Sequence, residues 1–182
     1  MGTLISGLGL WAVAHWFGRL APGLRAGMGR AGKGVVALLS LLAIWLMVRG
    51  YGQADPTVLW DLGAAGKGVN NLLMIPALAL VGAAHSKSRL RGALRHPMLW
   101  GAVLWALAHL IANGDLRSLV LFGGLGLWAL ISMALINRAE AAPERFSGGT
   151  RAGDIRLAVI TIVLYGAISA LHIWLGVNPF GA

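Results

Sequence analysis

Two nine-residue stretches of the chain end in the same pair of side chains, a tryptophan followed four residues later by a histidine. They are GLGLWAVAH at residues 7–15 and GAVLWALAH at residues 101–109, which share Gly, Leu, Trp, two Ala and His at equivalent positions. In a helix, a spacing of four places Trp and His on one face. A neutral imidazole binds metals, and small residues beside it leave room for a flat group. The pattern suggests a b-type haem held by His15 and His109.

A second interpretation of the same residues needs no cofactor. Each histidine would hydrogen-bond to a neighbouring helix, and the Gly and Ala residues would allow close helix packing, as is common in membrane proteins. The spacing alone does not separate the two interpretations. In the haem interpretation, Trp11 and Trp105 line the porphyrin edge and Ala106 lies beside the ring. Arg19, four residues after His15, is suited to a haem propionate or to lipid phosphate.

The chain contains no cysteine, which excludes disulfides, thiolate metal sites, iron–sulfur clusters and cysteine nucleophiles. Any metal or redox chemistry must therefore use histidine. Of the other three histidines, we expect His85 and His96 near one membrane surface and His172 near the opposite one. His172 is the third candidate, as an alternative ligand or as a residue that lines the site.

The composition is that of a polytopic membrane protein. Of the 182 residues, 58% are hydrophobic and 12% are charged, and the mean hydropathy is +0.75. Apolar runs long enough to cross about 30 Å of hydrocarbon predict six spans. They lie at about residues 4–20, 34–50, 69–85, 98–113, 118–137 and 155–177. We expect an all-α membrane helix bundle of about six transmembrane helices in one domain over residues 1–182, because the connections are short.

The 15 Lys and Arg residues are unevenly distributed among the connections. The first, third and fifth connections, with the span ends beside them, hold four Lys or Arg residues each. Only Arg49, Lys67 and Arg117 lie in or beside the other connections. The positive-inside rule then places the odd-numbered connections in the cytoplasm and both termini outside. The formal net charge of +9 is matched by membrane lipid head groups at the span ends, so it does not indicate nucleic acid as a partner.

Depth in the membrane distinguishes His15 and His109 from the other histidines. At about 1.5 Å of rise per residue, each ring lies about 16 Å along its span. The two spans run antiparallel, so both rings are expected near the bilayer midplane. An ionisable group at that depth needs a polar partner or a metal, which makes it a candidate functional residue.

One long stretch carries a family resemblance. RHPMLWGAVLWALAHLIANGDLRSLVLFGG at residues 95–124 resembles the core signature of the NnrU family, and AHWFGRLAPGLR, RGYG and LHIWLGV extend the resemblance over most of the chain. Membership implies a multi-pass protein of the bacterial inner membrane. It also implies an association with nitrite and nitric oxide reduction in denitrification, with redox or denitrification proteins as partners.

The NnrU family is similar to the plastid zeta-carotene isomerase, a membrane haem b enzyme that moves a polyene double bond between cis and trans. The later ligand histidine of the isomerase follows an RHP, as His109 does here, and His15 is the natural match for its other ligand. The resemblance therefore implies ligation of haem b by both histidines. The isomerase has a cysteine where this chain has Ala106, so a thiol-based ligand switch is excluded and haem-dependent isomerisation remains an alternative function.

Arg95, His96 and Pro97 suggest a weaker alternative. They resemble the signature of isoprenylcysteine and phospholipid methyltransferases, which bind S-adenosylmethionine at the membrane face. Those enzymes need a later acidic and aromatic motif, and the matching region here, NRAEAAPERFSGGTRAGD, lacks paired acids followed by tyrosines. The structural interpretation is a proline at a first helical position and an arginine that reaches lipid phosphate.

Two further motifs receive structural interpretations. Asp115 is expected to cap the start of the fifth span. Gly123, Gly124 and Gly126 lie in an apolar run, so we expect close helix contacts there and no phosphate-binding loop. Three function classes remain open: a haem-binding accessory, sensor or electron-transfer protein; an enzyme with a lipophilic substrate; and a scaffold without cofactor.

Overall fold

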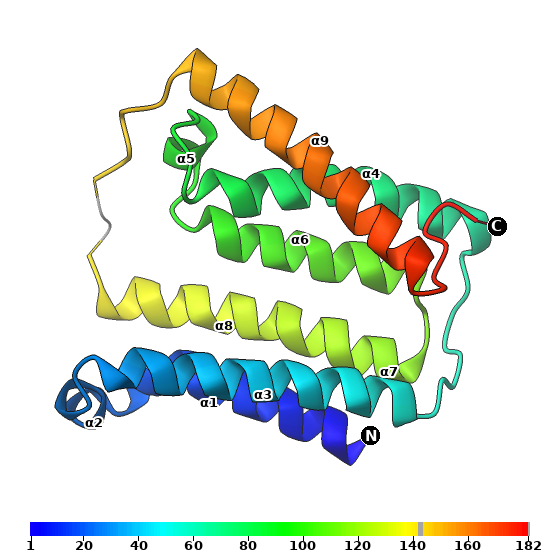
Figure 1. The fold of residues 1–182 in the computed structure, drawn as a ribbon, viewed down its shortest axis with the longest axis horizontal. Helices are drawn as coiled ribbons and strands as arrows, with labels where there is room; N and C mark the ends of the chain where they lie inside the picture. The colour runs from blue at the N-terminus through cyan, green and yellow to red at the C-terminus, as the bar shows by residue number, and fades with distance from the viewer. Residues whose placement is uncertain (142–143, 182) are drawn as a thin grey trace. The chain divides into compact units, whose positions relative to one another are not determined.

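The computed structural model describes residues 1–141 and 144–181, and the regular structure of these residues is helical (Figure 1). The elements are α1 (Gly2–Leu20), α2 (Pro22–Gly27), α3 (Ala31–Gln53), α4 (Gly63–Ala83), α5 (Leu90–Ala93), α6 (Pro97–Ala112), α7 (Leu116–Ser118), the π-helix η1 (Leu119–Gly123), α8 (Gly124–Ala139) and α9 (Arg151–Trp174). Strand pairing in the described ranges is limited to an isolated bridge between Val58 and Asp115. The prediction of an all-α fold is confirmed.

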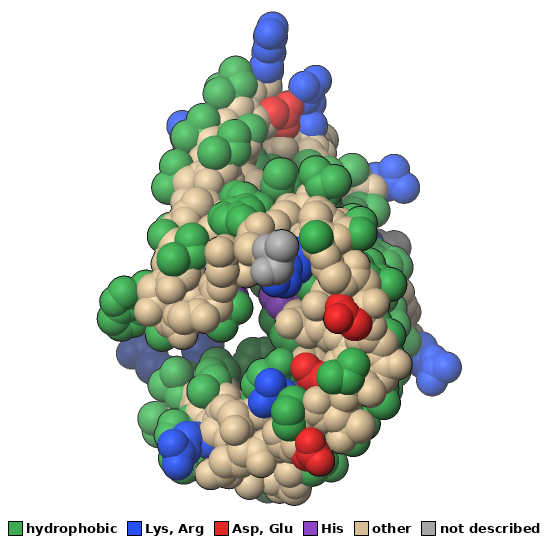
Figure 2. Space-filling model, turned by 90° about the vertical axis from the view of Figure 1, so that its right-hand side faces the viewer, with side chains coloured by type: hydrophobic (Ala, Val, Ile, Leu, Met, Phe, Trp, Pro, Cys, Tyr) green, Lys and Arg blue, Asp and Glu red, His purple; other side chains and the backbone are tan. Residues whose placement is uncertain are grey.

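Within the part of the chain that the structure describes, four helical segments are long and apolar enough to cross a membrane. They are α3, α4, the continuous segment Leu116–Ala139 and α9, which match the second, third, fifth and sixth predicted spans. The first and fourth predicted spans correspond to α1, with 19 residues, and to the shorter apolar helix α6, with 16. In α9 only 11% of the most apolar window is buried, and hydrophobic side chains cover much of the outer surface in Figure 2. Such a surface suits hydrocarbon better than water.

The chain divides into two compact units. Unit 1 contains Met1–Leu59 and Asp115–Gly124, and unit 2 contains Trp60–Gly114 and the chain from Leu125 onward. Unit 1 thus holds α1 to α3, α7 and η1, whereas unit 2 holds α4 to α6, α9 and all but the first residue of α8.

In unit 1, α1 packs against α3 through glycines that allow the two backbones to approach closely. A Cβ atom on Gly7 would lie 2.8 Å from the amide nitrogen of Met47 and 3.0 Å from the carbonyl oxygen of Ala43. Farther along, Gly50 of α3 faces the backbone of Leu4, whose side chain is fully buried. No side chain larger than hydrogen fits these two glycine positions without a shift of the helices.

In unit 2, α6 packs against α4 in the same way. A Cβ atom on Gly101 would lie 2.8 Å from the carbonyl oxygen of Ala77 and 2.9 Å from the amide nitrogen of Val81. Gly7 and Gly101 occupy equivalent positions in the repeated motif, and each faces a carbonyl and the amide four residues later on its partner helix. Close helix packing, the expectation that needs no cofactor, is confirmed for both glycines.

The alanines seven residues after these glycines continue the packed face. Ala14 is 2% exposed and Ala108 is fully buried. Because a spacing of seven returns to the same side of a helix, each glycine and alanine pair forms one contact stripe. The repeated motif therefore contains a packing stripe and, next to it, a Trp–His pair.

The predicted roles of residues at two helix starts are confirmed. Asp115 precedes α7, and its carboxylate accepts a hydrogen bond of 2.8 Å from the amide of Ser118. Pro97 occupies the first turn of α6, where its missing N–H leaves no partner unsatisfied.

Two of the three glycines of the fifth predicted span lie against other helices. Within unit 1, a Cβ atom on Gly124 would contact the side chain of Leu8, and within unit 2 one on Gly126 would lie 3.2 Å from Ala106. A Cβ atom on Gly123 would meet only Leu119, at 3.7 Å on the same helical segment. The expected close contacts are thus present at Gly124 and Gly126.

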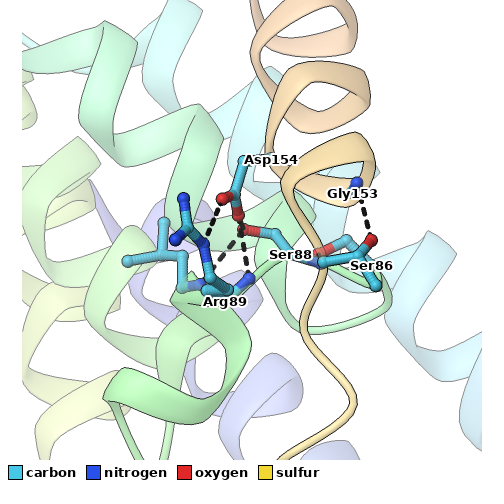
Figure 3. Close-up of polar contacts among 7 residues, drawn as sticks. Ser86, Ser88, Arg89, Gly153 and Asp154 are labelled. Atoms are coloured by element: carbon cyan, nitrogen blue, oxygen red, sulfur yellow. Dashed lines mark hydrogen bonds and ion pairs between the residues drawn. The ribbon is translucent and has the colours of Figure 1, made fainter.

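A polar anchor fastens the start of α9 to the connection between α4 and α6 (Figure 3). Asp154 accepts hydrogen bonds from the Ser88 hydroxyl at 2.7 Å and from the Arg89 amide at 2.8 Å. Its second oxygen pairs with Arg89 Nε at 2.6 Å. The Ser88 side chain is only 1% exposed, so its hydroxyl has no access to solvent as a substitute partner. The anchor joins segments separated by more than sixty positions in the chain.

The glycine contacts predict unequal effects of one added methyl group. Gly101→Ala should lower the free energy of unfolding by about 1–3 kcal/mol, because Cβ overlaps the α4 backbone. Gly68→Ala is the matched control, since a Cβ atom there meets nothing within 4 Å; it should be neutral or stabilising by up to about 1 kcal/mol. Thermal unfolding in detergent measures both effects. Equal midpoints for the two variants would contradict the tight contact.

The anchor predicts a second stability effect. Asp154→Ala should lower the unfolding midpoint, because it leaves the buried Ser88 hydroxyl without its acceptor. Asp55→Ala removes an exposed carboxylate and serves as the control. Limited proteolysis of the segment before α9 should accelerate in Asp154→Ala alone. Unchanged cleavage and an unchanged unfolding midpoint would show that the anchor contributes nothing.

Candidate functional site

His15 lies on the exposed side of α1 in unit 1. Its Nδ1 atom is 2.8 Å from the backbone carbonyl oxygen of Trp11. The imidazole and the Trp11 ring are stacked at a tilt of 33°, with their centroids 4.0 Å apart. Trp11 and His15 therefore form one aromatic surface along α1.

His109 repeats this arrangement on α6 in unit 2. Its Nδ1 atom is 2.9 Å from the carbonyl oxygen of Trp105, and the two ring centroids are 5.0 Å apart. His109 is half-buried, in contrast to His15. The two copies of the motif thus share a local geometry as well as a sequence.

The hydrogen bond to the backbone determines the tautomer of each ring. A carbonyl oxygen only accepts, so Nδ1 must carry the proton and donate it. In the neutral imidazole, Nε2 then holds the lone pair that binds a metal. His172 on α9 has the same geometry, with Nδ1 2.8 Å from the carbonyl oxygen of Ile168. Since Ile168 takes the place of tryptophan there, the helix backbone sets the tautomer and the Trp side chain does not.

The predicted site residues are divided between the two units. Unit 1 contains Trp11, His15 and Arg19, whereas unit 2 contains Trp105, Ala106, His109 and His172. In unit 2, His109 lies on α6 and His172 on α9.

The other predicted cofactor residues have defined local surroundings. Ala106 is 2% exposed and lies against Gly126 of α8. Arg19 is exposed in the last turn of α1. The roles of Trp11, Trp105, Ala106 and Arg19 in cofactor binding stay predictions.

Within residues 1–141 and 144–181, no group of three or more His, Asp or Glu side chains is arranged to hold a metal ion. A haem needs fewer protein ligands, because the porphyrin supplies four nitrogen atoms and the protein only the axial ones. The donor set of neutral Nε2 atoms is chemically suited to haem iron.

The RHP motif lies at a different place in unit 2, on the wall of a cavity of about 640 Å³. The guanidinium of Arg95 donates to the backbone carbonyl oxygens of Glu140 at 2.9 Å and Ala141 at 3.2 Å. His96 Nε2 lies 2.8 Å from the side-chain oxygen of Asn137. The motif thus fastens the start of α6 to the end of α8.

A family comparison covers almost the whole chain. The model of the NnrU protein family matches residues 3–179. The chain belongs to the NnrU family. Searches among curated proteins and among solved structures gave no match.

In this NnrU-family protein, the matched region includes all candidate ligands and the RHP motif. Two basic residues of the cavity, Arg91 and Arg145, were not among the predicted site residues and entered only the prediction of membrane orientation. Their common location was not visible in the sequence, because they lie in the third and fifth connections. A sequence feature that could have indicated their common location is the excess of arginine in both connections.

Proposed function

We propose that this NnrU-family protein binds haem b in the bacterial inner membrane and supports nitrite and nitric oxide reduction. His15 and His109 are the proposed axial ligands. The observation that carries the proposal is the donation by Nδ1 of each ring to the carbonyl oxygen of the preceding tryptophan, at 2.8 and 2.9 Å. This bond leaves Nε2 as the metal-binding atom and restrains the orientation of the ring.

The residues around the two histidines have proposed roles of their own. Trp11 and Trp105 present flat apolar surfaces next to the rings, which suits the edge of a porphyrin. Arg19 carries a planar cation that matches a propionate carboxylate. A bound haem would supply one-electron redox chemistry. Two histidine ligands would leave no coordination position for substrate, which favours electron transfer or sensing with a redox or denitrification partner.

His172 is the alternative to His15 as the second ligand. Its support is the same Nδ1 hydrogen bond and its location in the same unit as His109. If His172 takes this role, both protein ligands come from unit 2.

We also propose six transmembrane spans with both termini outside. The four long apolar segments support four spans, and α1 and α6 would supply the other two. An α6 of 16 residues extends about 24 Å, so crossing the membrane requires local thinning or snorkelling of flanking residues. The basic residues of the odd-numbered connections support the orientation.

Haem binding predicts a b-type spectrum that depends on named histidines. The purified protein, expressed with adequate haem supply, should show sharp reduced b-type bands after dithionite. His15→Ala and His109→Ala should abolish these bands or convert them to a five-coordinate spectrum, because each removes an axial nitrogen. His85→Ala is the matched control, because His85 is an exposed histidine outside the site.

The variants distinguish three outcomes. Loss of the bands in His172→Ala with their retention in His15→Ala would assign the second ligand to His172. Retention in every variant would refute histidine ligation. Absence of haem from a folded wild-type protein would refute the cofactor and leave the histidines as packing residues.

The orientation can be tested because the chain has no native cysteine. Asp55→Cys introduces an exposed thiol between α3 and α4, and Ser147→Cys introduces one between α8 and α9. A membrane-impermeant maleimide should label Asp55→Cys in intact spheroplasts, but Ser147→Cys only after permeabilisation. The reverse pattern would invert the proposed orientation, and labelling of both thiols in intact spheroplasts would contradict the number of spans.

A further inference from the structure

The cavity beside the RHP motif combines positive charge with an apolar wall. It lies in unit 2, at the end where α6 begins and α8 ends (Figure 1). Its volume of about 640 Å³ falls in the range of about 300–1,000 Å³ that is common for small-molecule sites. It is lined by Ala84, the segment 91–99, Ile136, Glu144, Arg145 and Phe146.

Three guanidinium groups of this cavity come from segments far apart in the sequence. Arg91 and Arg95 belong to the connection between α4 and α6, and Arg145 to the connection between α8 and α9. Glu144 is the one carboxylate among the lining residues, so the wall carries an excess of positive charge.

The hydrogen-bond partners of the arginines leave this charge uncompensated. Among the described residues, Arg95 donates to the backbone carbonyl oxygens of Glu140 and Ala141. Arg91 lies 4.3 Å from the centre of the Phe146 ring and donates to the Ser86 carbonyl oxygen at 3.4 Å. These partners are neutral groups. Within the described ranges, Arg145 has no hydrogen-bond or ion-pair partner.

Apart from His96 and Glu144, the rest of the wall is apolar, and part of it lies at the ends of apolar helices. Pro97 and Leu99 come from the first turn of α6, and Ile136 from the last turns of α8. Ends of membrane-spanning helices lie at the boundary between hydrocarbon and head groups. The cavity therefore offers cations and an apolar surface together at that boundary.

We propose that this cavity binds the phosphate group of an anionic phospholipid. Arginine matches phosphate by its planar fork of donors, and basic pockets between transmembrane helices bind anionic lipid head groups. Inorganic phosphate shares the anionic chemistry, but it has no apolar part to contact Pro97, Leu99 and Ile136. The apolar wall thus favours a lipid over a free ion. The site is separate from the proposed haem ligands and does not depend on haem.

The experiment uses the full chain, purified in a neutral detergent and stripped of native lipid. The measured quantity is the apparent affinity for added phosphatidylglycerol, phosphatidylcholine or inorganic phosphate, from ligand-dependent thermal shifts and from lipid retention in native mass spectrometry. The test variant is Arg91→Gln/Arg145→Gln. The matched control, Lys87→Gln/Arg151→Gln, also loses two charges at exposed positions near this end of unit 2 but outside the cavity.

We expect phosphatidylglycerol to bind the wild type and the control variant more tightly than phosphatidylcholine. The test variant should bind phosphatidylglycerol about tenfold more weakly, as loss of a charge-assisted hydrogen bond implies. The single variant Arg145→Gln should show part of this loss without a change in the lipid-free unfolding midpoint, because its side chain has no partner among the described residues.

Three results would overturn the proposal. The first is equal affinity for the two lipids. The second is an equal loss in the test and control variants, which would show a general effect of surface charge. The third is stabilisation by inorganic phosphate that phosphatidylglycerol does not reproduce, which would assign the cavity to a free anion.

Discussion

The close approach of paired helices at Gly7 and Gly101 is the constraint on which the rest of each unit depends. At both positions a hydrogen atom faces a carbonyl and an amide of the partner helix, where a methyl group would overlap them. The hydrophobic effect supplies no driving force between helices in lipid, so dense van der Waals contact must hold the pairs together. Because the glycine stripe faces the partner helix, the Trp–His pair on the same helix points elsewhere. The same motif thus supplies the face that packs against the partner helix and, next to it, residues of the candidate site.

The helix backbone also determines which ring nitrogen of these histidines carries the proton. A carbonyl four residues earlier is present in any helix, and here it accepts Nδ1–H from His15, His109 and His172. No additional residue is needed to place the ring proton on Nδ1. The tryptophans contribute instead through their rings, which stack beside His15 and His109. This division of roles explains how His172 adopts the same geometry after an isoleucine.

Polar contacts gather where the helices of unit 2 end. Asp154 fastens α9 to Ser88 and Arg89, and Arg95 donates to the carbonyl oxygens of the two residues that follow α8. Inside hydrocarbon such groups would be costly, whereas at helix ends they can meet both protein and lipid head groups. Three of the arginines on which the predicted orientation rests, Arg91, Arg95 and Arg145, also line the cavity. Positive charge at one end of unit 2 thus contributes to helix anchoring, to the predicted orientation and to the proposed lipid site.

Local patterns in the sequence determined the helical class, the apolar segments, the Asp115 cap, the Pro97 helix start and the family. Each depends on residues close together along the chain, so hydropathy and short motifs were sufficient to predict them. The Trp–His pairs belong to this group, since a spacing of four is fixed by the helix. Only the tertiary structure decided that Gly7 and Gly101 face partner backbones and that Arg145 shares a cavity with Arg91. These contacts join distant segments, and their partners depend on which faces of apolar helices pack together. A chain that is apolar around most of its helices carries little sequence signal for that choice.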